Sequence, residues 1–170
     1  MNRRIKATSK NKSSKVTHVL SSIFALELLA PSENIYLYSP WITDVKLLNS
    51  TFGQFRLILP GSGEQIISLS VILNTIAERG ANVFVQTRPS NSRNDPTSKF
   101  LKNLENQINI QLIENLHEKI LITDTSFFRG SMNFTYSGLY LNDEHVEISS
   151  DRTEIAQAMV DAKQRWEENL

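Results

Sequence analysis

The sequence predicts an α/β fold, a three-layer α/β/α sandwich around a mixed central sheet. Short apolar strand-like segments alternate with segments of helical periodicity along the 170-residue chain, and this alternation is typical of a sheet covered by helices on both faces. Hydrophobic residues make up 40% of the chain and charged residues 21%, as in ordinary globular proteins. The length suits one domain that buries its own core.

The first fifteen residues differ in charge from the rest of the chain. They carry six of the 18 basic residues and none of the acidic ones, so the remainder has 12 basic against 18 acidic residues and a net charge of −6. We expect a basic, flexible tail over residues 1–15 and a single domain over 16–170. The tail is either a phosphate-seeking arm or a solvated terminus.

The domain begins with a segment of helical periodicity. Its apolar residues recur at helical spacing as Val16, Leu20, Ile23 and Leu26. The same stretch contains His18 and Glu27 and lacks a small-residue cleavage site, so we expect an amphipathic helix rather than a signal peptide. No run approaches the ~20 apolar residues of a membrane span, and we expect a cytoplasmic protein without a transmembrane anchor.

The rest of the chain alternates predicted strands and helices. The predicted strands are short, apolar and bounded by turn residues: 35–39, 55–59, 82–86, 108–114, 119–124, 127–131 and 145–149. Helical spacing indicates a helix over 64–79, a short helix over 98–106, one or two turns over 134–140, and a closing helix with Ile155, Met159, Ala162 and Trp166 on its apolar face. Cysteine is absent, which excludes disulfides, thiol catalysis and thiolate zinc sites.

One stretch, LHEKILITDTSFFRGSMN over residues 116–133, concentrates polar groups on a predicted strand pair. Side chains alternate along a strand, so His117 and Lys119 share one face while Glu118 points away. Asp124 ends that strand. A neutral imidazole can attack phosphorus to form a covalent intermediate, and a lysine beside it compensates charge on the non-bridging oxygens. These residue types therefore suit a phosphodiester.

The second half of this stretch contains a turn, Gly130-Ser131-x-Asn133. Glycine permits close approach of the backbone, and the start of the next short helix offers unpaired N–H donors to an anion. Ser131 and Asn133 add directed hydrogen bonds. A second proton-transfer group must serve the leaving oxygen, and this stretch alone does not supply one.

Together these residues resemble the HxK(x4)D(x6)GSxN signature of the phospholipase D superfamily. The resemblance implies a phospholipase-D-like α/β sandwich and assigns a role to each matching position. It implies that His117 is the nucleophile in one copy and the general acid/base in the other, that Lys119 and Asn133 bind the phosphoryl oxygens with support from Ser131, and that Asp124 is largely structural.

The same resemblance extends to an acidic residue and to the oligomeric state. Glu144 lies eleven residues after Asn133 and matches the carboxylate that holds the histidine ring in single-motif nucleases of the family, with Glu147 as the alternative. The family uses two motifs for each active site and this chain has one. The resemblance therefore implies a homodimer about a two-fold axis, in which two copies of His117 face each other.

Three residues outside the motif are candidate substrate-binding residues. Trp41, directly after a predicted strand, either stacks on a base or packs into the core. Arg88 and Arg93 lie in the polar loop 87–96 and are candidate phosphate ligands. His145 is either a supporting residue of the site or a polar residue at the sheet edge. No H-x-H, D-x-D or H-E-x-x-H pattern occurs, so we expect no metal and no cofactor.

The leading functional hypothesis is a metal-independent phosphodiesterase that cleaves DNA or RNA through a phosphohistidine. The stretch ELLAPSENIYLYSPWITD also resembles small phospholipase-D-like proteins of bacterial DNA-modification and phage-defence islands, which implies a role in genome defence, alone or within a larger complex. Two alternatives stay open: a phospholipid phosphodiesterase or phosphatidyl transferase, and a non-catalytic nucleic-acid-binding subunit. No base-reading motif decides between DNA and RNA.

Overall fold

The computed structural model describes residues 2–7, 14–59, 65–90, 92 and 95–170. Seven of the described strands form a central sheet in the order β1-β9-β8-β7-β2-β5-β6. In that order the strands are Asn2–Ala7, Glu144–Ser149, Phe127–Gly130, Ile120–Ile122, Asn34–Tyr38, Asn82–Thr87 and Asn109–Leu112. Strand β5 pairs in parallel with β2 and β6, and the other pairings of this sheet are antiparallel.

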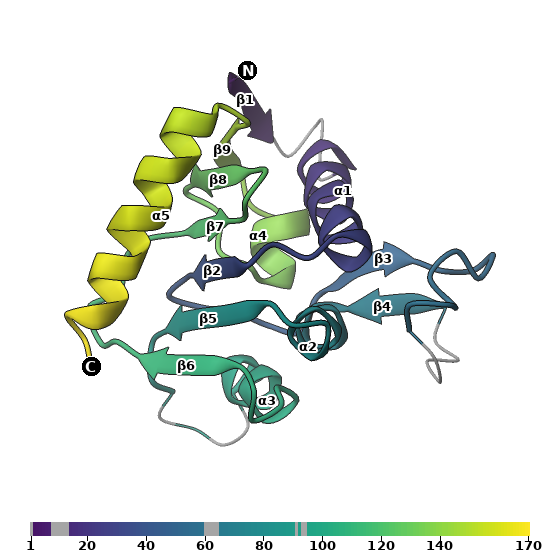
Figure 1. Ribbon diagram of the computed structural model, residues 1–170, viewed down its shortest axis with the longest axis horizontal. Coiled ribbons are helices and arrows are strands. Elements are labelled where there is room, and N and C mark those ends of the chain that lie inside the picture. The colour runs from purple at the N-terminus through teal and green to yellow at the C-terminus, as the bar shows by residue number, and fades with distance from the viewer. Residues whose placement is uncertain (1, 8–13, 60–64, 91, 93–94) are drawn as a thin grey trace.

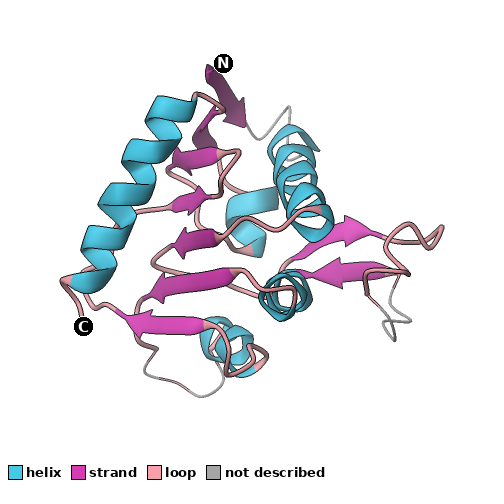
Figure 2. Ribbon diagram, viewed as in Figure 1, coloured by secondary structure: helices cyan, strands magenta, loops and turns pink. Residues whose placement is uncertain are grey.

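Helices cover both faces of the central sheet (Figure 2). Four of them contribute to one core: α1 (Ser14–Leu29), α2 (Leu69–Glu78), α3 (Pro96–Lys102) and α4 (Tyr136–Tyr140). Helix α5 (Arg152–Glu167) covers the opposite face. Strand β2 shows the division, because Ile35 and Leu37 lie in the core of α1–α4 whereas Tyr36 and Tyr38 pack towards α5. The three-layer α/β/α prediction is confirmed.

Aromatic contacts attach α5 to its face of the sheet. The ring of Tyr36 stacks on Phe84 with centroids 4.8 Å apart, and Phe84 meets Trp166 edge-on at 5.0 Å. The hydroxyl of Tyr38 donates to the carbonyl of Ala162 at 3.0 Å. The carboxylate of Asp151 caps the start of the helix by accepting from two backbone N–H groups, which satisfies donors that the first turn leaves free.

The N-terminal residues differ from their prediction. Residues 2–7, expected to be part of a flexible tail, form strand β1 and pair with β9 from Asn2↔Ser149 to Ala7↔Glu144. The charge run suggested a solvated terminus, but the backbone of a polar segment can still hydrogen-bond to an open sheet edge. Residues 8–13 of the expected tail lie outside the described residues.

The predicted strand over residues 55–59 is also wrong. These residues form successive turns, in which the N–H groups of Ile58 and Leu59 both donate to the carbonyl of Phe55. Phe55, Ile58 and Leu59 pack on the core while Leu57 is 97% exposed, so the spacing of the apolar residues is that of a turn. Two short strands, β3 (Lys46–Asn49) and β4 (Ile66–Ser68), flank this segment and project to one side of the molecule (Figure 1). The sequence did not indicate β3, and β4 occupies residues that were predicted as the start of the helix over 64–79, which begins at Leu69.

Candidate active site

The topology brings together the termini of five strands, β2, β5, β7, β8 and β9, along one side of the sheet where these strands begin or end. Strands β2 and β5 are parallel and β7 is antiparallel to β2, so the residues that follow β2 and β5 lie beside those that precede β7. The hairpin β7–β8 and the antiparallel pair β8–β9 bring the end of β8 and the start of β9 to the same edge. The carboxyl ends of parallel strands are a common position for ligand sites.

His117 and Lys119 lie in the extended segment that leads into β7. The alternation along this segment agrees with the prediction. His117 contacts Arg88, whereas Glu118 forms an ion pair of 2.8 Å with Arg165 of α5, on the opposite face of the sheet. The ammonium of Lys119 donates to the carbonyl of His117 at 2.8 Å. The imidazole and the ammonium therefore share one side of the segment.

Arg88 holds its guanidinium against the imidazole of His117. Its Nη2 lies 3.3 Å from both Nδ1 and Nε2 of the ring, which is a contact of the cation with the ring rather than one directed hydrogen bond. Its Nε donates to the carbonyl of Leu116 at 2.9 Å, and its Cζ lies 5.0 Å from the ring centroid of Trp41. Contacts on three sides fix the orientation of this guanidinium.

The environment of Lys119 favours its neutral form more than water does. Burial lowers the pKa of the Lys119 ammonium from its ordinary value, and the positive charge of Arg88 lowers it further, while Glu144 acts in the opposite direction. Among the described residues, no carboxylate lies within ion-pair distance of Lys119 or Arg88. Two cations without a carboxylate partner beside one imidazole form a site for an anion.

The glycine of the motif is required by close packing between β8 and β9. A Cβ atom on Gly130 would lie 2.1 Å from the carbonyl oxygen of His145, so a side chain at this position would displace a strand. The next residue bonds to the same partner: the N–H of Ser131 donates to the carbonyl of His145 at 2.9 Å, and the N–H of His145 donates to Oγ of Ser131 at 3.0 Å. The hydroxyl of Ser131 donates to the carboxylate of Glu144.

Asn133 is positioned by groups that are distant in the sequence. The buried hydroxyl of Ser39, directly after β2, lies 3.2 Å from Oδ1 of Asn133 and 3.0 Å from the carbonyl of Trp41. A Cβ on Gly138 would lie 2.2 Å from the carbonyl oxygen of Asn133, so α4 also approaches this turn closely. Helix α4 has only five residues and the hydroxyl of Thr135 already accepts from the N–H of Gly138, so the expected contribution of the helix start to an anion site gains no support.

Asp124 lies at the other end of β7, away from the other motif residues. Its carboxylate accepts from the N–H of Glu33 at 3.0 Å, and its own N–H donates to the hydroxyl of Ser32 at 2.9 Å. These bonds connect the β7–β8 turn to the loop between α1 and β2.

This turn is also where the chain departs from the family signature. Five residues separate Asp124 from Gly130, one fewer than the six of HxK(x4)D(x6)GSxN. The backbone groups of Thr123 and Ser126 bond to each other across a two-residue turn. The N–H of Gly130 still donates to the carbonyl of Lys119 at 3.3 Å. The shorter spacing is therefore taken up in the turn, and the motif residues at the other end of the hairpin remain adjacent.

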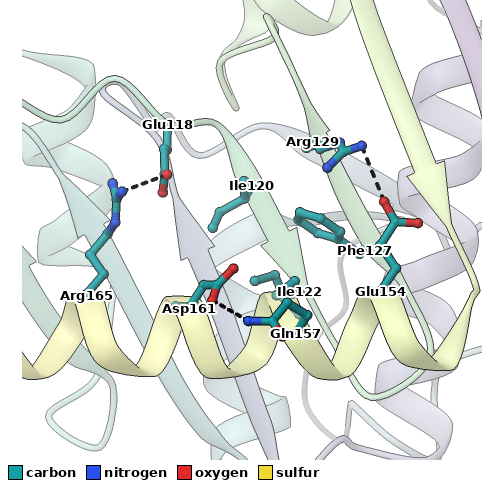
Figure 3. Close-up of a pocket in the computed structure, with 11 residues that line it drawn as sticks. Glu118, Ile120, Ile122, Phe127, Arg129, Glu154, Gln157, Asp161 and Arg165 are labelled. Carbon is teal, nitrogen blue, oxygen red and sulfur yellow. Dashed lines mark hydrogen bonds and ion pairs between the residues drawn. The ribbon is translucent and has the colours of Figure 1, made fainter.

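Two hollows adjoin the motif, and Glu118, Ile120, Phe127 and Arg129 line both of them. An open hollow of about 540 Å³ is lined by His117, Lys119, Gly130 and His145 among others. A smaller and more enclosed one, of about 230 Å³, lies between α5 and strands β7 and β8 (Figure 3). Its polar side chains bond to one another: Glu118 to Arg165 at 2.8 Å, Arg129 to Glu154 at 3.3 Å, and Gln157 to Asp161 at 2.8 Å.

The structure thus brings together most of the candidate residues. The contacts above link eight of them: Trp41, Arg88, His117, Lys119, Gly130, Ser131, Asn133 and Glu144. Asp124 is separate, and Arg93 lies outside the described residues. Glu147 bonds to Arg129 at 3.0 Å on the α5 face. Glu144 accepts from the hydroxyl of Ser131 and from the side-chain amide of Asn142, and the expected bond from Glu144 to the ring of His117 is not found among the described residues, where that ring contacts Arg88. Ser39 was missed, because a serine before Pro-Trp has no signal of its own in the sequence.

Within the described ranges, no three His, Asp or Glu side chains converge as metal ligands. None of the helices in that part of the chain is both long and apolar enough to cross a membrane.

Comparison with known proteins identifies the family. Residues 45–166, most of the chain and the whole motif, match the family described as "Cardiolipin synthase, PLD-like domain". The chain belongs to the phospholipase D superfamily. No curated protein sequence matches it significantly. Membership of this superfamily supports a phosphodiesterase.

Solved structures share the fold. The chain is similar to NucT from Helicobacter pylori, with a TM-score of 0.62 and 14% identity over 98% of this chain and 96% of that one. It is similar to Nuc, a phospholipase D family member from Salmonella typhimurium, at 0.59 and 16% over 100% and 97%. Phosphatidylserine synthase from Haemophilus influenzae matches at 0.52 and 12%, over 96% of this chain and 38% of that one. At these identities the likeness shows the fold alone.

Proposed function

We propose that this phospholipase-D-like protein is a metal-independent nuclease that hydrolyses DNA or RNA in an active site shared by two copies of the chain. The observation that carries the proposal is the arrangement at the start of β7. There His117 lies against Arg88 and beside Lys119, and no carboxylate of the described residues pairs with either cation. This arrangement suits a nucleophile that attacks a phosphate held by fixed positive charges.

The proposed reaction has two displacements at phosphorus. A ring nitrogen of His117 attacks, a P–N bond forms and the P–O bond to the leaving oxygen breaks, while His117 of a second copy protonates that oxygen. The second histidine then removes a proton from water, the water oxygen attacks phosphorus and the P–N bond breaks. The products are a phosphomonoester and a hydroxyl end. Lys119 and Asn133 would stabilise the phosphoryl oxygens, and Ser131 would hold Glu144 beside them.

The similar solved structures favour a nuclease over a lipid enzyme. The chain aligns with nearly all of NucT and of Nuc, at TM-scores of 0.62 and 0.59, but with 38% of phosphatidylserine synthase, at 0.52. The stretch ELLAPSENIYLYSPWITD, which resembles proteins of DNA-modification and phage-defence islands, supports a cytoplasmic role in genome defence, alone or within a larger complex.

A cleavage assay with EDTA present tests the proposal. Single- and double-stranded DNA and RNA are incubated with the parent protein and with His117→Ala, and molecular mass is measured by light scattering in the same buffer. We expect a dimer that cleaves at least one of these substrates in EDTA. His117→Ala should remain a dimer and lose at least ~10³-fold in rate, because the nucleophile is gone.

His18→Ala is the matched control for the histidine substitution. His18 is exposed on α1, so its loss should leave both cleavage and dimerisation unchanged. A parent protein that is inert on every nucleic acid, or that cleaves no faster than His117→Ala, would contradict the nuclease proposal.

The family description favours one second candidate, a phospholipid phosphodiesterase or phosphatidyl transferase. It predicts that the protein floats with anionic phospholipid vesicles in a density gradient and releases or exchanges a headgroup. Binding of nucleic acid by His117→Ala, together with no cleavage by the parent protein, would instead indicate a non-catalytic binding subunit.

A further inference from the structure

Trp41 lies on the surface beside His117, in a backbone segment that is fixed on both sides. Its side chain is 47% exposed. Its carbonyl accepts from Ser39 at 3.0 Å, and the neighbouring Ile42 pairs with Phe134 next to Asn133. The carbonyl of Pro40 accepts from the N–H of Arg88 at 3.2 Å. An aromatic side chain that is held rigidly and still exposed is available to a ligand.

Arg88 connects this aromatic ring to the nucleophile. Its guanidinium lies 5.0 Å from the indole centroid of Trp41 and touches the imidazole of His117 with Nη2. Nε is used by Leu116, and no described residue bonds to Nη1. A phosphate attacked by His117 therefore meets the free edge of Arg88, and the adjoining nucleoside lies within reach of Trp41.

From this row of side chains we infer that Trp41 and Arg88 form the binding site for an unpaired nucleotide, so that the substrate is single-stranded. Arg88 binds the phosphate that His117 attacks, and Trp41 stacks on the neighbouring base. Stacking on an aromatic side chain requires a free base face, which a base inside a duplex does not offer. The inference rests on the proposed nuclease activity and specifies its substrate.

Cleavage kinetics in EDTA measure the contribution of the indole. The substrates are a single-stranded oligonucleotide, the same strand in a duplex, and an oligomer of abasic tetrahydrofuran residues of equal length. We expect Trp41→Ala to lower kcat/KM on the single strand about 10-fold or more, because base–aromatic stacking is lost, and Trp41→Phe to retain most of it. The duplex should be cleaved poorly by every variant.

The abasic oligomer shows whether the indole acts through a base. It should already be a poor substrate, and Trp41→Ala should lower its cleavage no further, because the two changes remove the same contact. Phe52→Ala is the control, since Phe52 is 91% exposed in the turn after β3 and its removal should change nothing. Equal losses on the normal and abasic strands, or a duplex cleaved as fast as the single strand, would overturn the inference.

Fluorescence tests binding independently of turnover. The chain has two tryptophans, so Trp166→Phe leaves Trp41 as the only one and keeps an aromatic ring against Phe84. In this background, with His117→Asn to prevent cleavage, the single-stranded oligonucleotide should quench Trp41 and the abasic oligomer should not. Cleavage by the parent protein without this quenching would overturn the inference and would leave the nuclease proposal unaffected.

The remaining outcomes separate the two proposals. Quenching by the oligonucleotide in a protein that cleaves no nucleic acid supports the nucleotide site and contradicts the nuclease proposal. A spectral shift of Trp41 with phosphatidylglycerol vesicles and none with the oligonucleotide would assign the indole to a lipid surface and overturn the inference.

Discussion

At the scale of single residues, the protonation of Lys119 makes the site sensitive to pH. Its pKa is lowered below the ordinary value, first by burial and then by the charge of Arg88. A bound phosphodiester brings negative charge next to the ammonium and raises that pKa again. Substrate binding should therefore take up a proton at alkaline pH, and affinity should fall as Lys119 loses its proton.

The substitution Lys119→Arg isolates this effect, because a guanidinium stays protonated throughout. We expect KM of the parent protein to rise between neutral pH and about pH 10, and KM of Lys119→Arg to stay flat over the same range even if its kcat is lower. The measurement is a series of Michaelis–Menten curves across pH. A parallel rise in both proteins would assign the titration to another group.

The neighbouring Glu118 provides a contrast on the same three-residue segment. Its side chain points to the opposite face and pairs with Arg165, and both partners are about 40% exposed. Exposed ion pairs of this kind contribute little, about 0–1 kcal/mol. We expect Glu118→Gln to lower the free energy of unfolding by no more than about 1 kcal/mol in urea titrations and to leave kcat/KM nearly unchanged. A loss in kcat/KM like that of Lys119 variants would contradict the separation of the two faces.

At the scale of elements, a buried carboxyl group joins α1 to the loop before β2. Glu27 is fully buried and accepts from the N–H of Ser32 at 2.8 Å and from its hydroxyl at 3.0 Å. Ser32 in turn bonds to the N–H of Asp124. Burial raises the pKa of Glu27 from its usual value near 4.5, in spite of the hydrogen bonds from Ser32 that lower it.

This raised pKa predicts how stability changes with pH. Between the pKa of Glu27 in the unfolded chain and its higher pKa in the native protein, the native state binds more protons than the unfolded chain. The stabilisation that comes from the protonated carboxyl group is therefore complete below the unfolded-state pKa and is lost as pH rises through the native-state pKa. Glu27→Gln cannot titrate, and its free energy of unfolding should lack this decrease. Urea titrations of both proteins from about pH 4 upwards measure the difference. The same decrease in both proteins would contradict the assignment.

At the scale of the whole molecule, the proposed shared site makes each copy of the chain depend on another. If the leaving oxygen is protonated by His117 of the second copy, a mixed dimer of parent and His117→Ala lacks either the nucleophile or the acid. We expect that refolding equal amounts of the two proteins together lowers activity to about half of that of the parent protein alone, since only parent–parent dimers work.

The control for this experiment mixes the parent protein with His18→Ala, in which every dimer keeps both nucleophiles. Its activity should equal the sum of the two components. An unchanged activity after mixing with His117→Ala, with light scattering showing that dimers exchange, would mean that each copy works alone.

Much of the fold could be predicted from local pattern. Strands β2, β5, β7, β8 and β9 lie within two residues of their predicted bounds, because alternating burial and turn residues are local signals. The prediction was wrong where strand formation depends on a pairing partner. Strand β1 is polar but pairs with β9 at the edge of the sheet. Strands β3 and β4 are too short to show a period of two. The apolar residues 55–59 pair with no described strand and form turns instead.

The sequence alone determined which reactive residue types this protein offers, whereas the tertiary structure decided which of them lie together. Spacing within one hairpin determined that His117 and Lys119 share a face, because alternation along a strand is a local property. The contacts of Arg88 with His117 and of Ser39 with Asn133 join residues 29 and 94 positions apart. They form because parallel β2 and β5 end where antiparallel β7 begins, and strand order is set by packing of the whole chain rather than by any one segment.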